Sequence, residues 1–373
     1  MDFIPVCEPT LSGNEKKYLL DAFESGWISS QGKYVSKLEE TFSDYCGVKQ
    51  GIAVSNGTVA LHTALIALGI KNGDEVIIPN FDGIYAAFAV TYQGAIPVFV
   101  DAESKTWNID PKKIEEKITN KTKVIIAVHI YGHPCDMDPL IEIAKKYDLK
   151  ILEDAAEVHG GEYKNRKCGS LADISIFSFF ANKIATSGEG GIILTNDDEL
   201  ADKCRYYKNL CFPLKGSRNY IHEDIGYNYR MSNLAAAIAV AQLEKLDELV
   251  EMRRNNNNLY RIFLKDTLGI TFQPEKAWAK NVYWMNAIVI DRNEFGLNRD
   301  QLMQKLLEAG IQTRFFFTGM NRQPSLKKYG CDCSGQYPVS DWLADNGLYL
   351  PSSSNLSSEK INYICKKIIS LYT

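Results

Sequence analysis

Between about residue 50 and residue 195, short runs of apolar and β-branched residues alternate with segments that have helical periodicity, such as Thr58–Leu68 and Asp138–Tyr147. Strands that are apolar throughout and joined by helices predict a mostly parallel sheet flanked by helices. The predicted strands are Glu75–Pro79, Ile96–Val100, Val124–His129, Lys150–Leu152, Ile174–Phe180 and Gly191–Thr195. Too little chain separates the last two for a crossover helix, so we expect them to pair antiparallel at one side of the sheet.

The pattern changes from Ser232 onward. A long helix is predicted over Ser232–Asn255, followed by strands at Tyr283–Ile290 and Gln312–Phe316 and helices at Asn298–Glu308 and Ser358–Tyr372. This mixture predicts a smaller α+β domain after a large α/β domain. We place the large domain at residues 1–245 and the small C-terminal domain at residues 246–373.

Composition narrows the class of protein. The 373 residues are 45% hydrophobic and 24% charged with a formal net charge of −4, so we expect no basic surface for nucleic acid. The longest apolar stretches, Val124–Val128 and Ala235–Ala241, are far shorter than the roughly 18 residues of a membrane span. Met1–Thr10 has neither the basic nor the apolar region of a secretion signal. Nine scattered cysteines indicate reduced thiols. We therefore expect a cytoplasmic enzyme with no membrane or nucleic-acid partner.

Three features carry candidate chemistry. Ser55–Thr58 opens a helix and suits a phosphate, although a plain helix cap is the simpler interpretation of that segment alone. Asp154 ends an apolar strand, where it could hold a protonated ring nitrogen or cap a following helix. Lys183 lies between a Phe-rich strand and a Gly-rich turn, where an apolar pocket favours a nucleophilic amine, although most lysines lie at the surface. In this order the three features match the needs of pyridoxal 5′-phosphate (PLP): an anion cradle, a partner for the pyridine nitrogen and an amine for a Schiff base.

The sequence resembles the DegT-type sugar-nucleotide aminotransferases, within the fold type I PLP enzymes, over essentially its whole length. The segments that carry the resemblance are Trp27–Gly32, Ser55–His62, Tyr131–Met137, Glu153–Gly160, Phe177–Gly191 and Gly226–Asn233. The resemblance implies the aspartate aminotransferase-like fold, a large domain with a mostly parallel mixed sheet plus a smaller C-terminal domain. It also implies a homodimer with shared active sites.

The resemblance also assigns roles by position. Lys183 resembles the lysine that binds PLP and moves the proton, and Asp154 resembles the carboxylate on the pyridine nitrogen; both are catalytic. Further cofactor contacts are implied for Gly57, Thr58, Glu157, Ser178 and Asn228, the last from the neighbouring subunit. Substrate contacts are predicted for His159, Glu189 and Arg314.

Two positions depart from the family pattern. The aromatic residue that stacks on the exposed ring face of the cofactor is expected at Gly83; either Phe81 or Tyr85 supplies the ring, or that face is open. The Pro that usually follows Arg314 is also replaced. Both changes touch the acceptor pocket. We predict no metal site, because His129, His133 and Cys135 make a poor cage at a strand–Gly–Pro turn.

The resemblance implies transfer of an amino group from L-glutamate to a keto-sugar nucleotide, most simply a 4-keto-6-deoxy sugar for a surface polysaccharide. A lysine at position 183 argues for amine transfer, because related dehydratases carry His there. Two alternatives stay open. One is an aminotransferase for a small phosphorylated ketone such as dihydroxyacetone phosphate, and the other is a non-catalytic PLP-binding regulator.

Overall fold

A computed structural model describes residues 3–216 and 220–372 of the chain. Within this part, seven strands form the central sheet in the order β1-β9-β8-β5-β4-β2-β3. They are β1 (Gln50–Val54), β2 (Glu75–Pro79), β3 (Ile96–Val100), β4 (Thr122–Val128), β5 (Lys150–Asp154), β8 (Ile174–Ser178) and β9 (Gly191–Thr195). The strand β9 is antiparallel to both β8 and β1, and the other pairs are parallel. The predicted mostly parallel sheet and its antiparallel pair are confirmed.

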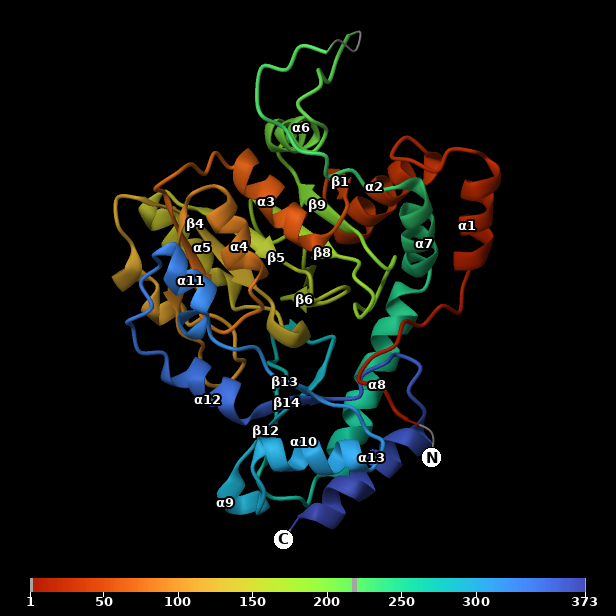
Figure 1. Cartoon of the computed structure of the whole chain (residues 1–373), viewed down its shortest axis with the longest axis vertical. Coiled ribbons are helices and arrows are strands. Elements are labelled where there is room, and N and C mark those ends of the chain that lie inside the picture. The colour runs from red at the N-terminus through yellow and green to blue at the C-terminus, as the bar shows by residue number, and fades with distance from the viewer. Residues whose placement is uncertain (1–2, 217–219, 373) are drawn as a thin grey trace.

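Helices flank this sheet and leave its strands almost entirely buried (Figure 1). They are α1 (Glu15–Glu24), α2 (Lys33–Cys46), α3 (Gly57–Ala67), α4 (Tyr85–Tyr92), α5 (Met137–Tyr147), α6 (Asp198–Tyr207) and α7 (Asn233–Leu243). Helix α3 packs against the strands β8 and β9 and against α4 and α6, which explains why it is apolar on nearly every side. Helix α2 is amphipathic, packs against β1 and α7, and ends at Gly47 with φ 69°.

The single long helix predicted over Ser232–Asn255 is wrong. The structure has two helices, α7 and α8 (Leu246–Phe263), because the backbone leaves the helical conformation at Lys245 (φ −117°, ψ 10°). Helix α8 then runs from the part of the molecule that holds the large sheet into the part that holds α10 and α13 (Figure 1). The domain boundary at residue 245 stays a prediction.

The C-terminal part is built on a four-stranded antiparallel sheet with the order β10-β12-β14-β13. The strands are β10 (Ile270–Phe272), β12 (Asn286–Ile290), β13 (Arg314–Phe315) and β14 (Gly347–Leu350), and the helices are α9 (Arg292–Phe295), α10 (Arg299–Glu308), α11 (Pro324–Tyr329), α12 (Pro338–Asn346) and α13 (Ser358–Leu371). A second hydrophobic core, which includes Ile4 from the N-terminal segment, lies between this sheet and the helices α8, α9, α10 and α13. The strand predicted at Gln312–Phe316 is reduced to two residues.

A small third sheet connects the two parts. Its strands are β6 (Glu162–Tyr163), β7 (Arg166–Lys167) and β11 (Ala279–Lys280), and β11 pairs with β6. This pairing holds the segment before β12 against the loop after β5. In the described part of the chain, no helix is both long and apolar enough to cross a bilayer.

Candidate active site

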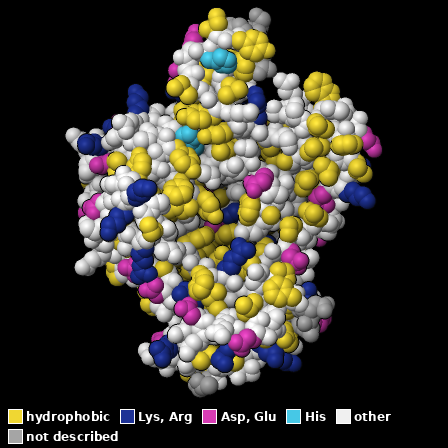
Figure 2. Space-filling view, in the orientation of Figure 1, with side chains coloured by type: hydrophobic (Ala, Val, Ile, Leu, Met, Phe, Trp, Pro, Cys, Tyr) yellow, Lys and Arg dark blue, Asp and Glu magenta, His cyan; other side chains and the backbone are white. Residues whose placement is uncertain are grey.

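A cavity of about 720 Å³ opens at the C-terminal ends of β5 and β8. The N-terminus of α3 forms one wall, and residues from β13 and β14 and from the segment before β12 line the opposite side. The space-filling view shows a hollow in the middle of one face of the molecule, with hydrophobic and basic side chains at its border (Figure 2). A cavity at the strand ends of an α/β sheet is where ligands of such folds bind.

Asp154 reaches this cavity because side chains alternate along β5. Glu153 points to the opposite side, where it accepts hydrogen bonds from the Gly169 and Leu171 N–H groups (2.6 and 3.0 Å). The Asp154 side chain lines the cavity, is 6% exposed and accepts one hydrogen bond in the described part of the chain, from Ala156 N (3.0 Å). Burial raises the pKa of Asp154. Turns and not a helix follow β5, so Asp154 is not a helix cap.

Lys183 lies in the loop between β8 and β9 and is buried, which rejects the alternative of a surface lysine. Its Nζ atom is 3.7 Å from Glu157 Oε1. Burial lowers the pKa of Lys183, and the nearby carboxylates of Glu157, Asp154 and Asp82 act in the opposite direction. Burial raises the pKa of Glu157 to about 7, although Lys183 and the Tyr131 N–H, which donates to Glu157 Oε2 at 2.8 Å, favour its ionised form. The site therefore holds an amine whose pKa is lowered by burial beside an acid whose pKa lies near neutrality.

The start of α3 offers backbone donors to an anion. The Asn56 side chain caps the helix by accepting a hydrogen bond from Val59 N (3.0 Å). The N–H groups of Gly57 and Thr58 both belong to the cavity wall and have no acceptor among the residues that the structure describes. Gly57 is required there, because a Cβ atom would lie 2.8 Å from Ser178 Cβ. Free N–H groups at a helix N-terminus fit a phosphate group.

Most of the predicted site residues are brought together. Those that line the cavity are Gly57, Thr58, Tyr85, Asp154, Glu157, Ser178, Lys183, Glu189 and Arg314. Three predicted residues do not line it. His159 is fully buried in the core, where Phe42, Phe177 and Phe179 surround its ring, so the structure does not place it where a substrate could touch it.

The other two are Phe81 and Asn228. Phe81 is buried against Tyr131, Phe316 and Phe317, which excludes it as the ring that faces the cavity. Asn228 is exposed on this chain, and its predicted role toward a neighbouring subunit stays a prediction.

Tyr85 occupies the space that a side chain at position 83 would need. A Cβ atom on Gly83 would lie 2.5 Å from Tyr85 Cε2 and 2.7 Å from its Cδ2. The Tyr85 ring can therefore take its position only because residue 83 has no side chain. The aromatic ring at the cavity wall thus comes from the first turn of α4.

The sequence alone did not indicate several aromatic and polar residues of the cavity. These include Tyr92, Asn182, Trp284 and Tyr349. Asn182 Oδ1 is buried and has no partner in the described part of the chain, so it is a free hydrogen-bond acceptor beside Lys183. The adjacency of Asn182 to Lys183 was the one available signal, because the other residues reach the cavity only through the tertiary fold.

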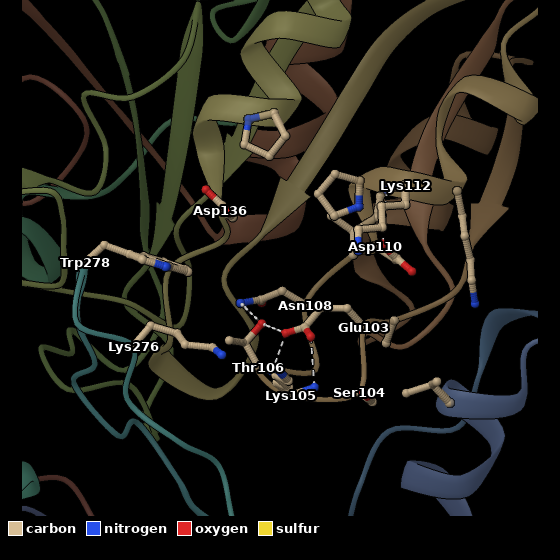
Figure 3. Close-up of a pocket in the computed structure, with 16 residues that line it drawn as sticks. Glu103, Ser104, Lys105, Thr106, Asn108, Asp110, Lys112, Asp136, Lys276 and Trp278 are labelled. Atoms are coloured by element: carbon tan, nitrogen blue, oxygen red, sulfur yellow. Dashed lines mark hydrogen bonds between the residues drawn. The ribbon is translucent and has the colours of Figure 1, made fainter.

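A second cavity of about 510 Å³ lies beside the segment 102–113 (Figure 3), and Lys183 is not among the residues that line it. Its acidic and polar groups largely bond to one another. Glu103 accepts hydrogen bonds from Lys105 N (2.9 Å) and from both Thr106 donors. Lysines and acids alternate along its wall, so it presents no concentrated charge to a ligand.

Three buried residues whose side chains could bind a metal lie close together on the side of β5 that faces away from the cavity. His129, Glu153 and Cys168 each offer an atom within 4.8 Å of the others. His129 Nε2 is bonded to Glu153 Oε1 (2.9 Å), and His129 Nδ1 accepts from Cys135 N (2.9 Å). Both imidazole nitrogens are thus used inside the protein, which identifies the group as a structural hydrogen-bond network.

A buried lysine, a strand-end carboxylate and a phosphate-suited helix start around one cavity of a mostly parallel α/β sheet define an enzyme of the PLP-dependent type. The chain belongs to the DegT/DnrJ/EryC1/StrS aminotransferase family, whose model matches residues 9–369. This membership confirms the predictions of an aminotransferase and of PLP as its cofactor.

The chain is similar to two proteins named GDP-perosamine synthase. That of Escherichia coli O157:H7 is 42% identical over 100% of both chains, and that of Vibrio cholerae is 40% identical over 98% of both. Among solved structures, that of DesI, determined in the presence of its TDP-sugar product, matches with a TM-score of 0.91 and 28% identity over 100% of this chain and 93% of its own. These likenesses confirm the family and the fold predicted from the sequence motifs.

Proposed function

We propose that this enzyme transfers the amino group of L-glutamate to the keto carbon of a nucleotide-linked 4-keto-6-deoxy sugar. The observation that carries the proposal is the single cavity that joins Lys183, Asp154 and the helix start of α3 to Arg314 at its open side. The relatives that are 40 to 42% identical over nearly the whole chain are named for a sugar nucleotide product, which supports this class of acceptor.

The residues of the cavity fit PLP. The N–H groups of Gly57 and Thr58 and the Ser178 hydroxyl would hold the phosphate, and Asp154 would hold the protonated pyridine nitrogen. When bound, PLP supplies a carbonyl that links to an amine and a ring that withdraws electrons from the reacting carbon. Lys183 Nζ would take a proton from the substrate carbon and return it, with Glu157 as its acidic neighbour.

Substrate recognition is assigned to the open side of the cavity. Arg314 is exposed on β13, opposite Tyr349 in the sheet, and its guanidinium suits the carboxylate of glutamate or a phosphate of the nucleotide. Glu189 is exposed on the loop after Lys183 and suits sugar hydroxyl groups. Both residues are accessible, as a large acceptor requires.

We further propose a homodimer with shared active sites, located in the cytoplasm. Tyr92 and Phe180 line the cavity and are exposed, and the large apolar side chains of Trp27, Ile28 and Ile225 are exposed elsewhere on the chain. Exposed apolar side chains support the proposal of a subunit interface. Asn228 is exposed within the segment that leads to α7, which would let it reach a partner's phosphate site. All nine cysteines are free, which supports a reducing compartment.

The acceptor is tested with a panel of GDP-, UDP- and dTDP-linked 4-keto-6-deoxy sugars together with dihydroxyacetone phosphate. Each is incubated with the holoenzyme and isotope-labelled glutamate, and the labelled amine is detected by mass spectrometry. We expect the label in a nucleotide sugar. Label only in dihydroxyacetone phosphate would replace the proposed acceptor by a small ketone, and label in no acceptor, without conversion of glutamate, would favour a regulator.

A further inference from the structure

Trp284 lies directly against the amine of Lys183. It is 3% exposed, lines the cavity and lies in the segment that leads into β12, with Met285 between it and the strand. Lys183 Nζ is 3.7 Å from the centroid of the indole ring, and the same nitrogen is 3.7 Å from Glu157 Oε1. The amine therefore has an aromatic face and a carboxylate as close neighbours.

The indole ring is fixed in this position by bonds to both parts of the molecule. Its Nε1–H donates to the carbonyl of Asn182 (2.8 Å), the residue immediately before Lys183. The backbone carbonyl of Trp284 accepts from the buried guanidinium of Arg253 on α8 (2.7 Å), and its ring stacks near Tyr131 at 6.4 Å. The C-terminal part thus holds the peptide that carries the lysine.

We propose that Trp284 is a positioning residue for Lys183, through its ring face toward the amine and its N–H toward the Asn182 carbonyl. An aromatic face attracts an ammonium group, and this attraction is larger when both groups are desolvated. The indole therefore favours the charged form of the amine and holds the amine inside the cavity whenever Lys183 is not linked to the cofactor. The proposal rests on the proposed function in one respect, namely that Lys183 is the lysine that binds PLP.

Other titratable groups near this amine also influence the pKa of Lys183. Asp154 at the end of β5, Glu157 after β5 and Asp82 after β2 favour the ammonium form. His159 is neutral there, because burial lowers its pKa to about 3. A change at Trp284 leaves all four groups in place.

The test measures the pKa of Lys183 itself. The full-length chain, freed of cofactor, is labelled with an amine-reactive reagent at a series of pH values, and the rate at Lys183 is read by peptide mass spectrometry. Trp284→Leu removes the ring face and should lower the pKa of Lys183 by about one unit, a tenfold change in the ionisation ratio. Trp284→Phe keeps a weaker ring face and should give a smaller shift in the same direction.

The matched control is Trp278→Leu. Trp278 also packs on aromatic rings, those of His133 and Tyr163, but it belongs to the second cavity (Figure 3) and not to the lysine site. The control should leave the pKa of Lys183 unchanged. Equal Lys183 pKa values in the wild type, Trp284→Phe and any folded Trp284→Leu would overturn the proposal. Because the measurement needs neither cofactor nor turnover, its outcome is independent of whether the proposed reaction occurs.

Discussion

Replacement of Glu157 by Gln should change how the stability of the cofactor-free chain depends on pH. Glu157 is 5% exposed, and burial raises its pKa from an ordinary value of 4.5 to about 7. Below pH 4.5 the carboxyl group is protonated in both the folded and the unfolded chain. As pH rises toward 7, the unfolded chain releases this proton first, so stability is lost through that window. The side chain in the Glu157→Gln variant cannot ionise, so the variant does not lose this stability as pH rises.

The structure gives the size of the effect. At 1.36 kcal/mol per pKa unit, the rise from 4.5 to about 7 corresponds to about 3 kcal/mol. With an unfolding entropy of about 2.1 cal/mol/K per residue, that free energy moves the Tm of a 373-residue chain by about 4 °C. Glutamine keeps the size of the side chain and an oxygen that can accept from Tyr131 N, so packing is preserved.

The assay is thermal unfolding of the wild type and Glu157→Gln at pH 4.5 and at pH 7, followed by circular dichroism. The Tm of the variant minus that of the wild type should increase by about 4 °C between the two pH values. Glu189→Gln, at an exposed carboxylate of the same cavity, is the control and should follow the wild type. A difference in Tm between Glu157→Gln and the wild type that is the same at both pH values would show that Glu157 does not titrate with a raised pKa in the folded chain.

Asp154→Asn should lower turnover about 100-fold or more with most PLP retained, because an amide cannot hold the pyridinium proton; near-normal turnover would make Asp154 structural. Gly83→Ala should displace the Tyr85 ring and weaken PLP binding about tenfold, as measured by cofactor titration. The same Gly83→Ala change made in the Tyr85→Ala variant should not weaken PLP binding further, and an equal loss in the wild type and in Tyr85→Ala would contradict the pairing of Gly83 with Tyr85. Mixing Lys183→Ala with Asn228→Ala subunits should restore about one working site per heterodimer, and confirmed heterodimers without activity would exclude sharing.

The sequence was most informative where an element is determined locally. The bounds of β2, β3 and β9 match the predicted runs because each is apolar throughout and ends at turn residues. Asp154 and Lys183 could be found because Asp154 ends an apolar strand and Lys183 lies in the loop after another. The break at Lys245 could not be found, because every residue around it favours a helix and the backbone change depends on the packing of α7 and α8.

Residues that reach the site from distant elements gave no local signal. Trp284 is 102 positions from Asn182 in the sequence, and only the fold joins them. Phe81 and Tyr85 were equal candidates for the ring because both lie near Gly83; the start of α4 at Tyr85 decides between them. His159 could be assigned only by position in a motif, and the core packing of Phe42, Phe177 and Phe179 determines where its side chain lies.

The central claim is that Lys183 carries the cofactor in this cavity, and reductive trapping tests it directly. The holoenzyme is treated with borohydride, which makes the link between PLP and the amine permanent, and the modified peptide is located by mass spectrometry. We expect the cofactor mass to be attached to Lys183 and Lys183→Ala to carry no label. Attachment to any other lysine of the wild-type chain would contradict the central claim.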